Sequence, residues 1–182
     1  MDKLPNNCSL CLISGGARSG KSRTALSLAR QAGEQRLFVA TAQAFDDEMT
    51  SRIDAHRMER PDFSTFEKPF DLRESFPGDK IWDVVLIDCL TLWLSNLLLS
   101  EFSDAAAEDS VYEDLRHLAN FTKKIILVSN EVGLGIVPEH ALARRFRDLN
   151  GRLQQGIARM SDEVYFAVMG AVIPLHSFPK VT

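Results

Sequence analysis

The stretch ISGGARSGKSRTAL, from Ile13 to Leu26, decides the fold. It contains the spacing G-x-x-x-x-G-K-[ST], which is filled by Gly15, Gly20, Lys21 and Ser22. In a loop of this spacing, successive backbone N–H groups surround a polyphosphate, the lysine reaches the outer phosphates and the hydroxyl binds Mg²⁺. The motif therefore predicts a site for a nucleoside triphosphate.

The residues on either side of this loop supply the context that the motif requires. An apolar run predicts a buried strand over residues 9–14, and the spacing of small and apolar residues predicts a helix over 21–32. The positive end of such a helix would point at the bound anion. The alternative is a plain glycine turn in an α/β unit, which the order strand, glycine loop and helix makes less attractive.

The length and composition are typical of a globular enzyme domain. The chain has 182 residues, 45% of them hydrophobic and 25% charged, which is enough for one sizeable core. We expect a single nucleotide-binding domain over 1–182, with peripheral tails at 1–8 and 174–182. The formal net charge of −4 argues against a partner such as nucleic acid, which needs a broad basic surface.

The cysteines and the apolar runs indicate the compartment. Cys8, Cys11 and Cys89 form no metal-binding set, and we expect reduced thiols that serve mostly as small core residues, as in the cytosol. The longest apolar run, 90–99, is too short to cross a bilayer, and the polar residues 1–7 do not resemble a signal peptide. The sequence predicts a cytoplasmic protein without membrane insertion.

Apolar runs alternate with helical patterns along the whole chain. The runs continue without polar alternation, which indicates strands covered on both faces. Further strands are expected over 37–40, 84–87, 124–129 and 164–169. Helices are expected over 46–57, 90–99, 104–121 and 139–160, the last with Pro138 at its start and a stripe of Leu142, Phe146, Leu149, Leu153 and Ile157. This order predicts an α/β fold with a mostly parallel sheet, flanked by helices, whose ligands bind at the carboxyl ends of the strands.

Three stretches follow the expected strands at that edge. Asp88 ends the run 84–87 and is either a carboxylate near Mg²⁺ or a turn residue. In the stretch 45–61, His56 stands among arginines, and it is either part of a cationic helix end or a nucleophile that attacks a nucleotide phosphate. Residues 130–138 form either a shaped active-site loop or a flexible connection.

Taken together, these stretches resemble one enzyme family. GGARSGKS (15–22), RIDAHRMERP (52–61), LIDCLT (86–91) and NEVGLGIVPE (130–139) occur in this order. They look like the bifunctional adenosylcobinamide kinase and adenosylcobinamide-phosphate guanylyltransferases of cobalamin biosynthesis. The resemblance covers the chain from Leu10 to about Gly170. It implies a RecA-like P-loop NTPase fold and a homo-oligomer, with a trimer as the expected state.

The resemblance also implies the reactions and the site residues. ATP or GTP phosphorylates adenosylcobinamide, and GMP then passes from GTP through His56 to adenosylcobinamide phosphate, which gives adenosylcobinamide-GDP and pyrophosphate. Lys21 is expected to act with His56 in catalysis, and Ser22 and Asp88 are expected to bind Mg²⁺. The expected nucleotide contacts are Gly15, Gly16, Ala17, Arg18, Ser19, Gly20, Lys21, Ser22, Ala40, Thr41, Ala42, Arg57, Met58, Glu59, Arg60, Glu67 and Asp88.

Some alternatives stay open. The family position of Asp88 can be Glu, and the sequence does not decide whether Glu67 or Asp88 reads guanine through its N1–H and amino group. The chain could also be a P-loop kinase without nucleotidyl transfer, in which His56 is structural. A nucleotide-gated switch protein is a further alternative of a different class.

Overall fold

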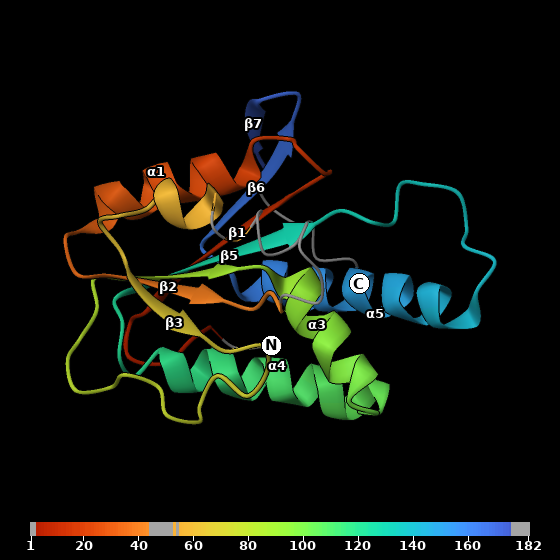
Figure 1. The fold of residues 1–182 in the computed structure, drawn as a ribbon, viewed down its shortest axis with the longest axis horizontal. Helices are drawn as coiled ribbons and strands as arrows, with labels where there is room; N and C mark the ends of the chain where they lie inside the picture. The colour runs from red at the N-terminus through yellow and green to blue at the C-terminus, as the bar shows by residue number, and fades with distance from the viewer. Residues whose placement is uncertain (1–2, 44–52, 54, 176–182) are drawn as a thin grey trace.

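A seven-stranded sheet with the order β3-β2-β4-β5-β1-β6-β7 forms the centre of the protein (Figure 1). The computed structural model describes residues 3–43, 53 and 55–175. Its strands are β1 Ser9–Gly15, β2 Arg36–Ala40, β3 Ser64–Glu67, β4 Val84–Asp88, β5 Lys124–Asn130, β6 Glu163–Val168 and β7 Ala171–Pro174. Its helices are α1 Lys21–Ala32, α3 Leu90–Leu99, α4 Asp104–Leu118 and α5 Ala141–Met160.

The strands pair in parallel throughout the sheet, except that β7 runs antiparallel to β6. β1 lies between β5 and β6, so that Gly15 is level with Asn130 on one side and with Ala167 on the other. On the far side of β5, Asp88 is level with Val128. The strand ends that carry the candidate residues therefore meet along one edge of the sheet.

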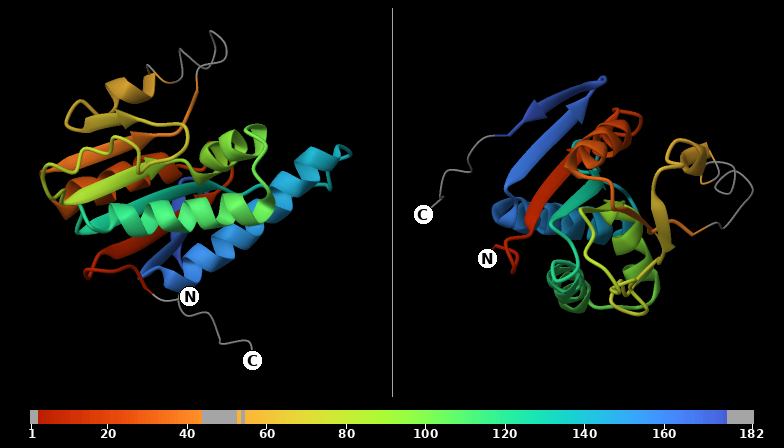
Figure 2. Two further views of the ribbon diagram at one scale, coloured as in Figure 1. Left: turned by 90° about the horizontal axis from the view of Figure 1, so that it is seen from below. Right: turned by 90° about the vertical axis from the view of Figure 1, so that its left-hand side faces the viewer.

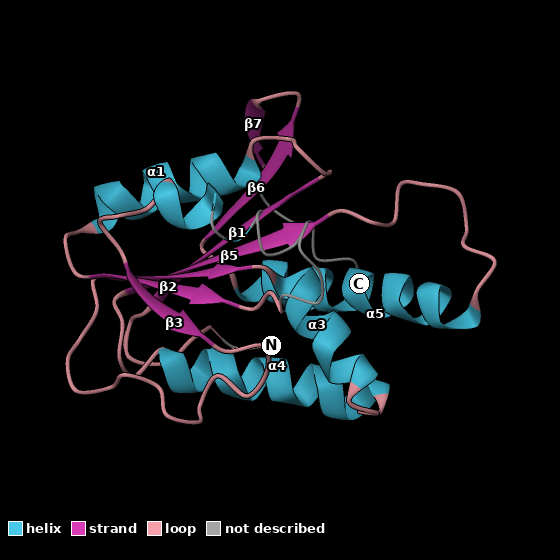
Figure 3. Ribbon diagram, in the orientation of Figure 1, coloured by secondary structure: helices cyan, strands magenta, loops and turns pink. Residues whose placement is uncertain are grey.

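Helices cover both faces of the sheet (Figures 2 and 3). α1 covers one face, where Ala25 and Ala29 pack with Ile13, Leu86 and other buried residues of the strands. α3, α4 and α5 cover the other face, whose larger core includes Trp93, Leu115 and Leu153. These two layers explain why the strands read as continuous apolar runs, and they confirm the predicted α/β class with a mostly parallel sheet.

The cysteines and the length of the helices relate to two further expectations. Cys8, Cys11 and Cys89 are free and buried, and burial raises the pKa of the Cys8 and Cys11 thiols to about 12 and that of Cys89 to about 11. Because these pKa values are high, all three side chains stay protonated near neutral pH. The reactive form of cysteine is the thiolate, so burial makes these thiols unreactive. Among the described helices, none is long and apolar enough to cross a membrane.

Two edge strands of four residues each, β3 and β7, were not predicted from the sequence. β3 has the sequence STFE with three exposed positions, and it pairs only with β2 at the edge of the sheet. β7 is also an edge strand, and it closes a hairpin with β6 through a turn at Met169 and Gly170, both of which have positive φ. Met169 was therefore wrongly included in the predicted strand 164–169, and β6 ends at Val168.

Helix ends differ from the prediction by a few residues. α4 ends at Leu118 rather than residue 121, and α5 begins at Ala141 after His140, so that Pro138 precedes the helix instead of starting it. Leu142, expected in the apolar stripe of α5, is 51% exposed, because the first turns of α5 extend beyond the edge of the sheet (Figure 1). The stripe is buried from Leu149 onward.

The expected tails are partly built into the domain, and one expected helix is described only in part. Leu4 and Cys8, in the expected tail 1–8, are buried with the larger core, and Pro174 is the last residue of β7. The predicted helix 46–57 lies mostly outside the described residues, although residue 53 and residues 55–58 are helical. The rest of the expected tail, 176–182, also lies outside the described residues.

Candidate functional site

The phosphate-loop motif connects β1 to α1 at the carboxyl edge of the sheet. β1 ends at Gly15 and α1 begins at Lys21, with Gly20 at its N-cap in a left-handed conformation with φ 95°. The first-turn N–H groups of α1 receive no side-chain cap, since Gly20 has no side chain to accept from them. The strand, glycine loop and helix predicted from the sequence are present, and the N-terminus of α1 opens into the loop.

The backbone of this loop is held from both sides by neighbouring strands. Glu131 N donates to Gly15 O at 2.9 Å, and Gly170 N donates to Ser19 O at 3.0 Å. A Cβ atom built on Gly15 would lie 2.3 Å from the carbonyl oxygen of Ala167, so this position cannot hold a side chain without a backbone shift. Ala17 and Arg18, at the outer side of the loop, are exposed.

Lys21 lies inside the loop rather than in solvent. Its side chain is buried, and Nζ donates to Gly16 O at 3.0 Å. Burial lowers the pKa of Lys21, and the nearby carboxylate of Asp88 acts in the opposite direction. The ammonium group is thus already placed among the loop carbonyls, where a phosphate could replace the Gly16 carbonyl as its partner.

Asp88 is the point on which the candidate catalytic groups converge. It ends β4 and is half-buried, and burial raises its pKa. A hydrogen bond from Ser22 and the electrostatic influence of His56, Lys21 and Arg60 oppose that rise. Ser22 of α1 is therefore in hydrogen-bond contact with Asp88 at the end of β4, and charges of α1 and of the segment before β3 act on the same carboxyl group. The peptide bond between Asp88 and Cys89 is cis.

Ser22 and Asp88 are suited to the Mg²⁺ ion that the motif implies. A hydroxyl and a carboxylate are oxygen ligands, and Mg²⁺ at phosphate sites needs only one or two protein ligands, because substrate phosphates and water supply the others. The described residues contain no cluster of three or more His, Cys, Asp or Glu side chains that could hold a metal by themselves. The protein ligands present fit a metal that is bound together with a nucleotide.

The residue that follows β2, Thr41, is buried and is hydrogen-bonded to the residue that follows β4. Thr41 is fully buried; its hydroxyl accepts from Cys89 N at 2.8 Å and donates to Cys89 O at 2.9 Å. The Thr41 side chain is therefore committed to holding two strand ends together. Of the predicted contacts Ala40, Thr41 and Ala42, Ala42 is the most accessible, being half-buried.

His56 lies on the helical turn of residues 55–58, and this turn is anchored to α1. His56 Nδ1 lies 3.6 Å from Glu59 Oε2, and both side chains are more than half exposed. Arg30 of α1 donates to Glu59 O at 2.9 Å and pairs with Asp62 at 2.9 Å. Met58 is 83% exposed. The imidazole is accessible to a nucleotide, as a nucleophile must be.

The two arginines after His56 have different environments. Arg57 is half-exposed and forms an ion pair with Glu67 at the end of β3. Arg60 is only 4% exposed; its guanidinium lies 3.6 Å from the centre of the Phe38 ring, and Nη1 donates to Thr65 at 2.7 Å. Burial lowers the pKa of Arg60. The side chains of Arg57 and Glu67 are accessible from solvent, whereas that of Arg60 is buried.

Beyond β5, the structure supports a shaped edge at Asn130 and an exposed loop after it. Asn130 Nδ2 donates to Thr91 at 2.8 Å, and its carbonyl accepts from Asn150 at 3.3 Å and from Gln154 at 3.2 Å. Ser14 donates to Gln154 at 2.6 Å. Sequence analysis missed Ser14 of β1 and Asn150 and Gln154 of α5. A polar side chain within an otherwise apolar pattern could have indicated them.

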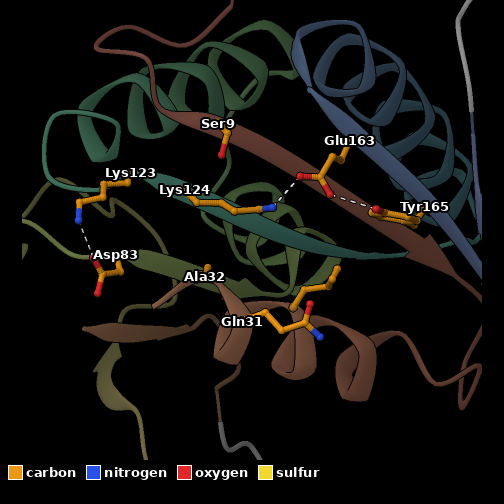
Figure 4. A pocket seen from close by; sticks show the side chains of 9 residues that line it. Ser9, Gln31, Ala32, Asp83, Lys123, Lys124, Glu163 and Tyr165 are labelled. Carbon is orange, nitrogen blue, oxygen red and sulfur yellow. Dashed lines mark hydrogen bonds and ion pairs between the residues drawn. The ribbon is translucent and has the colours of Figure 1, made fainter. Parts of the chain in front are cut away.

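A cavity of about 500 Å³ lies elsewhere, between α1 and the amino ends of β1, β5 and β6 (Figure 4). Its charged groups are paired: Lys124 with Glu163 at 2.6 Å, and Lys123 with Asp83 at 2.8 Å. None of the predicted site residues lines it. Because the charges compensate one another and the phosphate loop lies at the opposite edge, this cavity is separate from the candidate site.

Comparison with known proteins identifies the family. The sequence profile of the cobinamide kinase / cobinamide phosphate guanyltransferase family matches residues 11–175. The bifunctional adenosylcobalamin biosynthesis protein CobP of Pseudomonas aeruginosa is 46% identical over 171 residues, covering 92% of this chain and 98% of that protein. The bifunctional adenosylcobalamin biosynthesis protein CobU of Escherichia coli is 39% identical over 175 residues, covering 88% of this chain and 96% of that protein.

Similarity to solved structures is more distant. The flagellar accessory protein FlaH of Methanocaldococcus jannaschii has a TM-score of 0.47 at 15% identity, covering 93% of this chain and 76% of that chain. The RadB recombinase has a TM-score of 0.43 at 13% identity, covering 87% and 73%. The family assignment comes from the sequence relatives, and the four motifs noted above lie within the matched residues. The chain belongs to the cobinamide kinase / cobinamide phosphate guanyltransferase family.

Proposed function

We propose that this chain catalyses both reactions of its family, with His56 as the nucleophile of the second. It phosphorylates adenosylcobinamide with ATP or GTP, and then transfers GMP from GTP to adenosylcobinamide phosphate, giving adenosylcobinamide-GDP and pyrophosphate. The observation that carries the proposal is the buried Lys21, bound to Gly16 O within the phosphate loop, together with an exposed His56 on a turn that is anchored to α1 through Arg30 and Glu59. One site thereby combines a polyphosphate cradle with an accessible imidazole.

The phosphate loop serves the donor nucleotide in both reactions. Loop N–H groups and Lys21 neutralise the outer phosphates, and the N-terminus of α1 adds its positive dipole. When bound at Ser22 and Asp88, Mg²⁺ would supply further charge neutralisation to the phosphate oxygens. In the kinase reaction these groups hold the γ-phosphate in line with the substrate hydroxyl, and no covalent enzyme intermediate is needed.

Guanylyl transfer needs the imidazole in addition. A neutral His56 nitrogen attacks the α-phosphorus of GTP, the P–N bond forms, and the bond to the β-phosphate oxygen breaks to release pyrophosphate. The phosphate of adenosylcobinamide phosphate then attacks the same phosphorus and displaces the imidazole, so that His56 is regenerated. Arg57 and Arg60 lie on the same segment as His56, and their positive charges stabilise the negative charge that develops on the transferred phosphate.

Guanine recognition is assigned to Glu67. Its carboxylate is half-exposed and pairs with Arg57, whereas Asp88 is turned to Ser22 and the metal side of the loop. A carboxylate can accept from both N1–H and the amino group of guanine, and adenine offers no matching pair of donors. Glu67 therefore suits base recognition better than Asp88 does.

The assembly and compartment are also proposed. The loop after β5 exposes Leu134, Ile136 and Val137 at 82%, 96% and 59%, and contiguous apolar side chains of this kind favour burial against another surface. We expect a homo-oligomer, with a trimer as the expected state, in the cytoplasm. Light scattering after gel filtration measures the mass, and a monomer at micromolar concentration would contradict the assembly.

The decisive experiment uses GTP labelled at the α-phosphate. Wild-type protein should form an acid-labile, base-stable adduct, which is the behaviour of a phosphoramidate. His56→Ala should form none and should lose guanylyl transfer, while ATP-dependent kinase activity remains measurable. His140→Ala is the matched control, since His140 is exposed just before α5, and it should label like the wild type.

Each alternative function gives a different result in the same experiment. A kinase without nucleotidyl transfer would show no adduct in the wild type. A nucleotide-gated switch would show neither transfer activity, only slow hydrolysis. Labelling that persists in His56→Ala would place the nucleophile at another residue and would overturn the proposed role of His56.

A further inference from the structure

One amide side chain joins the two ends of the segment that carries the proposed nucleophile. We call residues 41–69, which follow β2 and include β3 and the two residues after it, the crossover segment; the structure describes 41–43, 53 and 55–69 of it. Asn96 of α3 donates through Nδ2 to Thr41 O at 2.9 Å and to Pro69 O at 2.8 Å. These carbonyls belong to the first and the last residue of the crossover segment.

Asn96 is unusual in its own helix. α3 reads LTLWLSNLLL, and seven of its residues are buried, Asn96 among them at 6% exposure. A buried amide in such a setting costs desolvation free energy unless both N–H groups find acceptors, and here both do. A leucine would suit the apolar surroundings, so the amide is explained by the two carbonyls that it binds.

The same group of contacts leads directly to the catalytic edge. Thr41, whose carbonyl accepts from Asn96, also binds the backbone of Cys89 through its hydroxyl, and Cys89 follows Asp88. At the other end, Lys68 N donates to Ala40 O at 3.0 Å. The crossover segment is therefore fixed at its origin to β4 and at its end to β2, and Asn96 spans the two fixed points.

We propose that Asn96 is a positioning residue for guanylyl transfer: it sets the place of the crossover segment, and hence of His56 and Glu67, relative to the phosphate loop. This inference rests on the proposed role of His56. The kinase reaction with ATP depends on the loop, Ser22 and Asp88, all of which lie outside the crossover segment. Loss of the Asn96 contacts should therefore separate the two activities of one active site.

The test compares Asn96→Leu and Asn96→Ser with the wild type. Leucine keeps the approximate volume and removes both hydrogen bonds, whereas serine can donate only one and should be milder. The matched control is Thr122→Val, which removes the hydrogen bond from the buried Thr122 to Lys124 O at 3.0 Å near the opposite edge of the sheet. All three variants lose buried hydrogen bonding, so general loss of stability is common to them.

We expect Asn96→Leu to slow adduct formation from α-labelled GTP by about 10- to 100-fold, because small displacements of a reacting group have effects of that size. The turnover number of the ATP-dependent kinase reaction should change by less than about threefold, on the same principle. Thr122→Val should leave the ratio of the two activities unchanged. An equal fall of both activities in Asn96→Leu and Asn96→Ser would show a merely structural role and would overturn the proposal.

Hydrogen–deuterium exchange separates this proposal from the role of His56. Asn96→Leu should speed amide exchange in residues 55–69 while exchange in α1 stays at the wild-type rate, whatever the nucleophile is. Unchanged exchange in residues 55–69 would show that Asn96 does not hold the crossover segment in place. Faster exchange with unchanged labelling would refute the positioning role. Persistent labelling in His56→Ala would refute the nucleophile, and the exchange result would still decide whether Asn96 holds the segment.

Discussion

Replacement of Gly15 by alanine should damage both the fold and the site, and replacement of its neighbour should not damage the fold. A Cβ atom on Gly15 would lie 2.3 Å from Ala167 O, 3.1 Å from Ala167 C and 2.8 Å from the Ser19 hydroxyl. The hydroxyl can turn away, but the Ala167 carbonyl is backbone of β6, paired in register with Gly15. Ordinary contacts of this kind are about 3.4 Å or longer, so β1 and β6 would have to separate by about 1 Å.

The expected loss of stability in Gly15→Ala follows from the packing and pairing that this separation of β1 and β6 would disrupt. Overpacking of a well-packed interior costs about 1–3 kcal/mol, and more where backbone must move. The shift would also weaken the last pairing between β1 and β6. We expect Gly15→Ala to lower the free energy of unfolding by about 3 kcal/mol and to impair both activities, since Gly15 O accepts from Glu131 N next to the phosphate loop.

The assay is urea unfolding followed by circular dichroism, with kinase and guanylyl-transfer rates measured on the same preparations. Gly16→Ala is the matched control, because a Cβ atom there would meet nothing within 4 Å. Its free energy of unfolding should stay within about 0.5 kcal/mol of the wild type. A Gly15→Ala variant as stable as Gly16→Ala would refute the packing argument.

Four further substitutions each remove a single charge. Lys21→Ala should lower both activities at least tenfold, since a charge-assisted contact to phosphate is worth about 1.5–3 kcal/mol; full activity in both assays would contradict the phosphate-loop assignment. Asp88→Asn should raise the Mg²⁺ concentration needed for half-maximal activity, and Glu67→Gln should reduce the preference for GTP over ATP in labelling; the reverse pattern would exchange their roles. Burial raises the pKa of Asp114 from 3.8 to about 6, so the native state binds its proton more tightly than the unfolded state does. The wild type should therefore lose up to about 3 kcal/mol of stability relative to Asp114→Asn as the pH rises from 4 to 7, measured by urea unfolding, and no pH-dependent difference would refute the shift.

The sequence predicted what local pattern determines. The phosphate loop, its flanking strand and helix, and the position of Asp88 at the end of β4 all follow from short stretches of chain. β3 could not be found in this way, because its four residues are mostly exposed and its only signal is the pairing with β2. Edge strands of this type have little apolar pattern, so tertiary pairing determines them.

The contacts within the site depended on tertiary structure. Arg60 could be recognised as a candidate from its neighbours in the chain, but its burial against Phe38 could not. The contact of Thr41 with Cys89 likewise joins residues that are far apart in sequence. Asn96 was visible as a polar residue in an apolar helix, yet only the structure shows the two carbonyls that it binds. A residue could be recognised as a candidate when the signal lay within one stretch of sequence. Its contacts could not be predicted when they join two or more distant segments.

The central place of β1 has a consequence for biosynthesis on the ribosome. The phosphate-loop motif is translated before the strands that flank β1, which are β5 and β6, and before Gly170, whose N–H supports the loop through Ser19 O. Domains form as the chain emerges, and contacts between distant segments must wait for the later partner. A nascent chain that ends before β6 should therefore fail to bind nucleotide, and nucleotide should select polypeptides in which β5, β6 and the turn at Gly170 have already been made.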